Sequence, residues 1–311
     1  MSLGLYLHIP YCFSKCRYCD FYSHPGERGV PEAYVDALLR ELSRFAPERP
    51  LQPDTLYFGG GTPSLLRPEQ AKRLIDAARP MPGAEITLEA NPETVTEESL
   101  AGFREAGVNR ISFGVQSARD TQLRTLGRPH TAKQARAAFA AARHAGFTNI
   151  SGDIMLALPR YTEAEFDETL ELIEGGGATH ISAYLLTLEP GTPLYNRRES
   201  LPIPDSDAAA ELYLYACDLL GQAGFERYEI SNFAKNGCVS RHNIKYWTGE
   251  NYLGIGPAAH SFWNGLRFHY DRDLEGFLSA PRVTQDGTGG GIEETVMLRL
   301  RLKSGLSLEG L

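Results

Sequence analysis

Three cysteines follow the first predicted strand closely enough to share one inorganic group. Cys12, Cys16 and Cys19 form the pattern C-x3-C-x2-C in the segment YLHIPYCFSKCRYCDF. Structural zinc sites usually take four protein ligands, and no second cysteine pair lies downstream, where Cys217 and Cys238 stand alone. An iron–sulfur cluster held by three cysteines leaves one iron open to an exogenous ligand. The spacing therefore favours such a cluster, with a zinc ion or three cysteines without a metal as the alternatives.

A glycine-rich turn follows the second predicted strand. Gly59, Gly60, Gly61 and Thr62 stand in the segment FGGGTPSLL. Glycines there let the backbone approach a ligand closely and present N–H groups to it. Such turns are also common after strands without any binding role. Together with the cysteine loop on the neighbouring strand, the turn is a candidate ligand contact.

Four polar side chains stand in or just after the third, fourth and fifth predicted strands. Glu89 offers a carboxylate to a cationic ligand, or acts as a solvated cap. Gln116 can both donate to and accept from a ribose, and Arg128 presents a fork that suits a carboxylate. Asp153 lies inside a strand, where a buried charge needs a partner, and Arg128 is the first candidate.

Two of the eight histidines stand in irregular, aromatic-rich sequence. His242 and His260 lie in the stretch Asn232–Tyr270, and histidine is a frequent axial ligand of heme iron. Aromatic side chains nearby offer flat walls for a porphyrin, although such stretches more often pack a core. His242 and His260 are therefore candidate heme ligands, with packing as the alternative role.

The elements that must position these residues alternate between short apolar runs and helical periodicity. Six runs are predicted as strands: Leu5–Ile9, Thr55–Phe58, Glu85–Glu89, Arg110–Phe113, Asn149–Met155 and His180–Leu185. Five segments are predicted as helices, several with glycine after their last residue: Pro31–Phe45, Pro68–Ala78, Glu97–Ala106, Ala132–Ala145 and Glu163–Glu174. This order predicts an α/β fold with a parallel sheet. The candidate site residues fall just after the strands, where barrels place their active sites.

The rhythm changes after about residue 195. A linker at Pro202–Asp205 precedes a predicted helix at Asp207–Gly221 and a strand at Phe225–Ile230. We expect residues 1–195 to form a partial barrel and residues 196–311 to form an accessory α+β segment packed on it.

Charge and hydropathy exclude several classes of protein. The 311 residues include 31 Lys and Arg against 39 Asp and Glu, a formal charge of −8. This acidic balance argues against a duplex nucleic-acid binder, and no run approaches the roughly 18 apolar residues of a membrane span. The start, MSLGLYLHIP, lacks the pattern of a signal peptide. We expect a cytoplasmic protein, in which closely spaced cysteines serve metal or redox chemistry.

The cysteine pattern after the first strand of a βα barrel resembles the radical S-adenosylmethionine (SAM) superfamily. Seven further motifs resemble its anaerobic coproporphyrinogen III oxidase family: YLHIPYC, FGGGTPSLL, EANPETV, RISFGVQS, LGRPH, DIMLALP and GIGPAAHS. The resemblance implies a partial (β/α)6 barrel of TIM type. It also implies that Cys12, Cys16 and Cys19 hold a [4Fe-4S] cluster whose open iron binds SAM.

One departure within the motifs points to a branch of that family. The oxidative decarboxylases carry a further cysteine, C-x3-C-x2-C-x-C, and its position is Phe21 here. Three features resemble the HemW branch of heme chaperones: that departure, H-N-x-x-Y-W at His242–Trp247, and A-H-S at Ala259–Ser261. The first motif begins after only five residues, whereas the decarboxylases have a longer N-terminal extension. Family members continue into a C-terminal helical region that barely begins before Leu311.

The resemblance implies a protein that binds heme and passes it to an acceptor hemoprotein. Its partners would be heme and that acceptor, without nucleic acid, and any membrane contact would be peripheral and made through the acceptor. The alternatives are oxygen-independent coproporphyrinogen III oxidation, radical chemistry on an unrelated substrate and a zinc-binding module. Phe21 weighs against the first of these, and SAM cleavage stays open. Family matching implies ten residues around SAM: Tyr6, Tyr18, Gly60, Gly61, Thr62, Glu89, Gln116, Arg128, Asp153 and Thr187.

Overall fold

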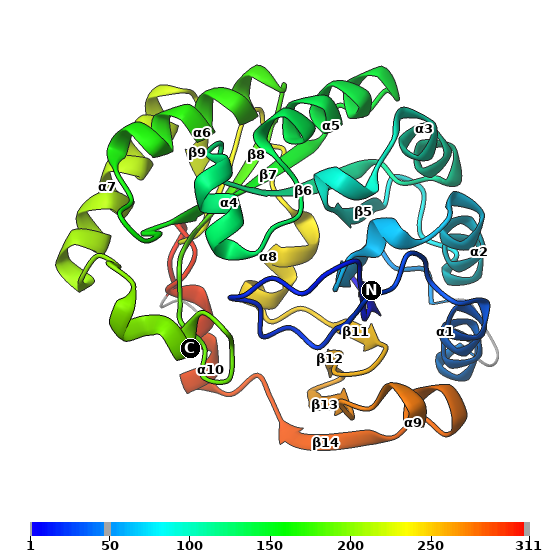
Figure 1. The fold of residues 1–311 in the computed structure, drawn as a ribbon. Helices are drawn as coiled ribbons and strands as arrows, with labels where there is room; N and C mark the ends of the chain where they lie inside the picture. Colours follow the sequence, from blue (N-terminus) through cyan, green and yellow to red (C-terminus); the bar gives the residue numbers. More distant parts are fainter. Residues whose placement is uncertain (1, 47–50, 308–311) are drawn as a thin grey trace.

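Six parallel strands form the centre of one sheet, in chain order, in the computed structural model, which describes residues 2–46 and 51–307. They are β1 (Gly4–Ile9), β4 (Thr55–Gly60), β5 (Glu85–Ala90), β6 (Arg110–Gln116), β7 (Ile150–Leu156) and β8 (His180–Leu185). Each strand is hydrogen-bonded in parallel to the next. Figure 1 shows the strands gathered at the centre with helices around them. The predicted α/β fold with a parallel sheet is confirmed.

The helices between these strands occupy the predicted places. They are α1 (Glu32–Phe45), α2 (Pro68–Ala78), α3 (Glu97–Ala106), α5 (Ala132–His144) and α6 (Glu163–Gly175). One further helix, α4 (Asp120–Leu126), escaped prediction because seven residues make only about two turns and show no clear apolar period. Three short 3-10 turns complete this part: Pro63–Leu65, Pro92–Thr94 and Tyr195–Ser200.

Each long helix buries one apolar stripe and has a defined start. In α1, Val35, Leu38 and Leu42 recur at helical spacing and are buried against the sheet, each burial contributing about 1.5–3 kcal/mol. At the start of α3 and of α5, the hydroxyls of Thr96 and Thr131 accept a backbone N–H three residues ahead. These caps satisfy donors that the helix itself leaves unpaired.

Side chains alternate along the strands between an apolar outer face and a polar interior. Leu5, Leu7 and Ile9 of β1 are fully buried in the apolar core. Tyr6 and His8 lie between them and face the opposite side, because successive strand residues alternate. The same alternation puts further polar side chains on the inner side of the other strands: Thr55, Tyr57, Glu89, Ser112, Asp153 and Ser182.

The C-terminal part extends this sheet at both edges. On one side, β10 (Asn232–Ala234) pairs antiparallel with β8, and β9 (Glu226–Arg227) pairs with β10. On the other, β11 (Tyr252–Ile255) pairs in parallel with β1. Three antiparallel strands follow it to the outer edge: β12 (His260–Trp263), β13 (Leu266–Tyr270) and β14 (Val283–Thr288).

The strands after residue 195 thus continue the central sheet at both edges, and the predicted division into residues 1–195 and 196–311 stays a prediction. The added strands satisfy the free backbone groups at the edges of β1 and β8, which an overlying layer would leave unpaired. The predicted helix is present as α7 (Ser206–Gln222), whereas the predicted strand Phe225–Ile230 is reduced to β9. The remaining helices are α8 (Arg241–Thr248), α9 (Leu274–Ser279) and α10 (Ile292–Arg299).

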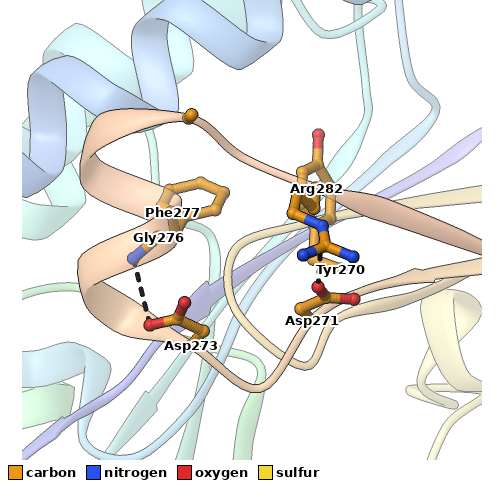
Figure 2. A pocket seen from close by; sticks show the side chains of 7 residues that line it. Tyr270, Asp271, Asp273, Gly276, Phe277 and Arg282 are labelled. Carbon is orange, nitrogen blue, oxygen red and sulfur yellow. Dashed lines mark hydrogen bonds and ion pairs between the residues drawn. The ribbon is translucent and has the colours of Figure 1, made fainter.

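A short turn joins β13 to β14 through α9. Asp273 caps α9 by accepting the Gly276 N–H at 3.0 Å, and Arg282 faces Asp271 at 3.5 Å (Figure 2). The cavity between these residues is about 10 Å³, room for a single water at most. The turn is therefore a joint that sets the start of β14, too small to hold a larger ligand.

Candidate functional site

A cavity of about 360 Å³ opens at the carboxyl ends of the parallel strands, beside the cysteine loop. Eleven of the predicted site residues line it: Cys12, Cys16, Cys19, Tyr18, Gly60, Gly61, Thr62, Glu89, Gln116, Arg128 and Asp153. They come from loops and strands up to 141 positions apart, from Cys12 to Asp153. The barrel mouth thus gathers the chemistry that the sequence placed after separate strands.

The cysteine loop is held by backbone hydrogen bonds at both ends and in the middle. The two-residue strands β2 (Tyr11–Cys12) and β3 (His24–Pro25) pair across its base. The Arg17 N–H donates to the Leu126 carbonyl at 2.8 Å, which ties the loop to the end of α4. Short α4 therefore has a definite function in positioning this loop.

The three thiols are free and partly enclosed. Burial raises the pKa of Cys12 and of Cys19, so neither thiol ionises readily by itself. A bound cationic centre supplies the missing charge and favours the thiolates. The loop thus suits an inorganic group better than a free reactive cysteine.

The distances between the three thiols distinguish a site for an iron–sulfur cluster from a site for a single metal ion. Within residues 2–46 and 51–307, the one group with three His, Cys, Asp or Glu ligand atoms within 4.8 Å of one another is His260, His269 and Asp286. The three thiols therefore lie farther apart than one zinc ion requires. They fit a cluster in which each cysteine holds a different iron.

The two inner carboxyl groups are buried, and the charges of Arg110 and, for Asp153, of Arg128 do not offset that burial. The Tyr57 hydroxyl donates to Glu89 at 2.8 Å and the Gly60 N–H at 3.2 Å, and burial raises the pKa of Glu89 to about 7. Burial likewise raises the pKa of Asp153 to about 6, against the opposing effect of hydrogen bonds from Ser182 and Ser112. A cationic ligand in the cavity would restore both charges.

The expected pairing of Asp153 with Arg128 is absent. Asp153 accepts from the Ser112 hydroxyl at 3.3 Å, and Arg128 is directed elsewhere. The Arg128 guanidinium donates to Cys16 Sγ at 3.5 Å, to Asn91 Oδ1 at 2.7 Å and to the Gly114 carbonyl. Serine hydroxyls on the neighbouring strands are closer to the carboxylate, and the pattern of the sequence did not reveal them.

Asn91 links the two sides of the cysteine loop. Its amide donates to Thr62 Oγ1 at 3.1 Å, and that hydroxyl donates to Cys12 Sγ at 3.5 Å. On its other side Asn91 accepts from Arg128, which reaches Cys16. A continuous chain of hydrogen bonds thus runs from Cys12 to Cys16 through the ends of β4 and β5. The sequence offered only the position of Asn91 after a strand as a signal.

Close approach explains the glycines of the turn after β4. A Cβ atom on Gly61 would lie 2.7 Å from the Tyr11 carbonyl oxygen and 3.0 Å from Cys12 Sγ. Gly60 has φ of +112°, and a Cβ there would meet the His8 ring at 2.5 Å. Only glycine lets this turn pack against the first cysteine.

Gln116 supplies a polar atom that the protein itself leaves unpaired. Its Oε1 is buried without a hydrogen-bond partner, although the side chain lines the cavity. Its backbone φ of +68° is unusual for a residue other than glycine. An unpaired buried acceptor at a strained position fits a site that a ligand completes.

Two of the predicted SAM contacts lie apart from the cavity lining. Tyr6 is one layer deeper in the barrel, where its hydroxyl pairs with His8 Nδ1 at 3.0 Å and its ring stacks on Tyr57. Thr187 follows β8 and is exposed. Conversely, Tyr184 and Phe21 line the cavity although no SAM contact was predicted for either.

The two predicted heme ligands lie in very different surroundings. His242 is completely buried, and its ring nitrogens pair with Thr55 Oγ1 at 2.8 Å and with the Tyr246 hydroxyl at 2.9 Å. Thr55 begins β4, so this contact lies at the end of the barrel opposite the cysteine loop. Both ring nitrogens are engaged in hydrogen bonds within the protein, and heme ligation by His242 stays a prediction. His260 on β12 is exposed.

Comparison with known proteins places the chain in a family. The model of the radical SAM superfamily matches residues 6–173. A heme chaperone HemW of Bacillus subtilis (strain 168) is 37% identical over 97% of this chain and 84% of its own length. The chain belongs to the HemW family of radical SAM proteins. The HemW of Haemophilus influenzae is 40% identical over 96% of this chain and 82% of its own length.

The chain is also similar to a mitochondrial protein and to a solved enzyme structure. A mitochondrial radical SAM domain-containing protein 1 of Bos taurus is 41% identical, and this chain spans 60% of its length. The structure of the coproporphyrinogen III oxidase HemN of Escherichia coli matches with a TM-score of 0.79 over 96% of this chain and 74% of its own. Its 23% identity supports the shared fold alone.

Membership of the radical SAM superfamily implies a [4Fe-4S] cluster and SAM as cofactors. The site fits both. Three free thiols line the cavity, and next to them it holds two carboxyls, a buried arginine and the unpaired Gln116 acceptor. The predicted cofactors of this family are thereby consistent with the chemistry of the residues present.

Proposed function

We propose that this protein is a heme chaperone, which binds heme and delivers it to an acceptor hemoprotein. The observation that carries the proposal is the 37% identity to a heme chaperone across 97% of the chain. A second observation agrees with it: Phe21 stands where the decarboxylase pattern has a cysteine, and its side chain is 69% exposed at the cavity. An apolar, exposed residue there cannot act as a thiol in oxidative decarboxylation.

We further propose roles for the cavity residues in holding the cofactors. Cys12, Cys16 and Cys19 would each hold one iron of the cluster. Glu89 would face the positive charge of SAM, while Arg128 would hold its carboxylate, since opposite charges attract strongly in an enclosed site.

The remaining predicted contacts of SAM are proposed in the same way. Gln116 would use its free Oε1 on the ribose. Tyr18, Gly60, Gly61, Thr62, Asp153, Tyr6 and Thr187 would complete the surroundings, the last two from outside the cavity lining. With the cluster held by Cys12, Cys16 and Cys19, the chemistry supplied to the site would be one-electron reductive cleavage of SAM. The residues named above orient SAM and exclude water from it.

Heme titration of the anaerobically reconstituted protein tests the main proposal. We expect a Soret shift that saturates at a fixed heme-to-protein ratio, and then loss of heme to an apo-hemoprotein added in excess. The variants His242→Ala and His260→Ala examine the two predicted ligands, which stay predictions. Absence of a Soret shift would remove the chaperone function.

A second assay separates the chaperone from the alternative enzyme. Incubation with coproporphyrinogen III, SAM and a reductant under anaerobic conditions should leave the substrate unchanged. Formation of protoporphyrinogen would instead establish oxygen-independent coproporphyrinogen III oxidation, the activity named for the structural neighbour HemN.

We propose a cytoplasmic location, with heme and an acceptor hemoprotein as the partners. Within the described residues, no helix is long and apolar enough to cross a bilayer. Any contact with a membrane would then be peripheral and would come through the acceptor. Fractionation of cells with and without a membrane-bound hemoprotein acceptor would test this arrangement.

A further inference from the structure

Two histidines and an aspartate gather on the outer strands β12, β13 and β14, away from the cysteine loop. His269 Nδ1 lies 2.8 and 3.0 Å from the two carboxylate oxygens of Asp286, and His260 Nδ1 lies 4.0 Å from one of them. The two imidazole rings stack with centroids 5.0 Å apart. One ligand atom from each residue falls within 4.8 Å of the other two. Figure 1 shows these strands at the lower edge of the sheet.

The strand pairing brings these three side chains together. His260 and His269 are direct cross-strand partners in the antiparallel pair of β12 and β13. Cross-strand partners point to the same face of a sheet, so the two rings meet. The register of β14 then jumps, because Arg267 pairs with Gly287 and the next residue, Phe268, pairs with Gln285. Asp286 is the extra residue of this bulge.

The bulge gives Asp286 its direction. A β-bulge leaves one residue without a cross-strand partner and turns its side chain, and bulges recur beside functional sites. Gly287 follows with a φ of +126°, a conformation that glycine adopts without cost. The backbone of β14 therefore directs the Asp286 carboxylate toward both imidazoles. The short side chain of an aspartate is enough to reach them.

The geometry is close to that of a single coordinated ion. With metal–ligand bonds of about 2.0–2.2 Å, neighbouring ligand atoms lie about 2.8–3.6 Å apart in octahedral or tetrahedral sites. Asp286 Oδ2 lies 3.0 Å from His269 Nδ1, within that range, and 4.0 Å from His260 Nδ1, just beyond it. A small rotation of the His260 side chain, which is 68% exposed, would close the wider gap.

The ligand types select the class of ion. Imidazole suits zinc, copper, iron and nickel, whereas magnesium and calcium prefer sites made of oxygen ligands. A carboxylate with two imidazoles offers three ligands on one side and leaves the other positions to water. A heme iron differs, since each face of the porphyrin leaves it one axial position, so two of the three ligands would be unused.

Two cationic side chains, Arg267 and Arg272, act on His260, and the charge of Arg267 is already neutralised. Arg267 lies on the same strand as His269, and its guanidinium pairs with Glu294 at 2.5 Å and stacks on the Phe262 ring. Repulsion of an incoming cation by Arg267 is therefore reduced. His260 and Asp286 stay open to solvent, so an ion reaches the site without rearrangement of the core.

We propose that His260, His269 and Asp286 bind one divalent transition-metal ion, of the zinc, cobalt or nickel class, on the outer strands of the sheet. The site is separate from the cysteine loop. It shares His260 with the predicted heme ligands, so that side chain would serve either the ion or heme. The ion would bridge β12, β13 and β14 and so stabilise the edge of the sheet. Ligands held on three strands make binding and folding of this edge mutually reinforcing.

Calorimetric titration of the anaerobically reconstituted protein tests the proposal. The cluster then occupies the cysteines, so added zinc finds only the remaining sites. We expect one additional equivalent to bind, and cobalt in its place to show visible absorption from nitrogen and oxygen ligation. His260→Ala and Asp286→Asn should each weaken binding at least about tenfold.

His144→Ala is the matched control. His144 is an exposed histidine with a carboxylate, Glu97, 3.9 Å away, but it has no third ligand. This variant should bind zinc as the wild type does. His260→Ala should fold as the wild type does, because the His260 side chain lies at the surface. The melting temperature of the variant checks this.

Three results would overturn the proposal. No binding of zinc or cobalt is one, and equal affinity of the wild type, His260→Ala and Asp286→Asn is another. The third is loss of heme binding in these variants with no effect on zinc, which would make the cluster a heme contact.

Discussion

Replacement of Asn91 by alanine is expected to weaken SAM binding while leaving the barrel folded. Asn91 bridges Thr62 and Arg128 through hydrogen bonds of 3.1 and 2.7 Å. In the alanine variant, Arg128 keeps the Gly114 carbonyl and Cys16 as partners but loses the acceptor that fixes its direction. The proposed carboxylate clamp would then be mobile.

The size of the effect follows from the lost contacts. A hydrogen bond to a charged group contributes about 1.5–3 kcal/mol, and a neutral one about 0.5–1.5 kcal/mol. Arg128 retains two partners, so we expect the charged contact to contribute at the lower end, about 1.5–2 kcal/mol to SAM binding. That corresponds to an increase in the SAM dissociation constant of about 10- to 30-fold. Asn91→Asp keeps the acceptor for Arg128 and loses the donor to Thr62, and it should show the smaller loss.

Calorimetric titration of the reconstituted variants with SAM is the direct assay. The matched control is Asn109→Ala, because Asn109 also bridges two partners, the Ile86 N–H at 2.8 Å and the Ala84 carbonyl at 2.8 Å, at the other end of the sheet. Both variants should lose stability in urea, but only Asn91→Ala should lose SAM affinity. Equal SAM affinity for Asn91→Ala and wild type, with the cluster intact, would refute the idea that Asn91 positions Arg128.

Three further predictions concern the cavity and the histidines. Gly61→Ala should lower the iron bound per chain, because the new Cβ would lie 3.0 Å from Cys12 Sγ, and iron and sulfide analysis measures this. The pKa of Glu89 is raised to about 7, so the folded protein holds a proton that the unfolded chain has lost between about pH 4.5 and 7, and this contribution to stability falls as pH rises. Urea denaturation of cluster-free wild type and Glu89→Gln at pH 5 and 7.5 should show the variant losing less stability across that interval. In urea denaturation of metal-free protein, His242→Ala should cost about 2–4 kcal/mol, whereas exposed His260→Ala should change stability by less than about 0.5 kcal/mol. Equal costs would contradict the assigned burial.

The sequence predicted the elements of the barrel because each carries a local signal. β1 reads as an apolar run, and α1 repeats its apolar residues at helical spacing. Glycine follows α3 directly and adopts a positive φ there, as the stop signal requires. These signals depend on neighbours within a few residues, so no knowledge of the tertiary structure is needed to read them.

The sequence did not predict which distant strands pair with one another or which distant side chains contact. The meeting of β11 with β1 joins residues about 250 positions apart, and the apolar pattern of Tyr252–Ile255 does not name its partner. The same holds for His242, whose aromatic surroundings were compatible with a heme site and with a core. Its contact with Thr55 depends on α8 crossing the amino end of β4, which only the tertiary fold determines.

Asn91 and Asp153 show where reasoning from residue types stops. A buried Asp does need partners, and the prediction of a partner was sound. Two serines at alternate positions of the neighbouring strands provide them, and serine carries no signal in a strand pattern. Arg128 was correctly placed near the site, but the asparagine that directs it stood out only by its position.

The polar inner face of the barrel is open to a ligand at one end and closed at the other, and α8 closes it. At the cysteine end the inner face must accept a charged ligand, which agrees with the raised pKa of Glu89 and of Asp153 there. At the other end the same polar inner face must be closed, because unpaired buried groups are costly. The start of α8 does this: the N–H groups of Arg241 and His242 donate to the Glu85 carboxylate at 3.1 and 3.0 Å. The accessory segment thus completes the core of the barrel itself, and a chain cut before it would leave this end of the sheet with unpaired polar groups.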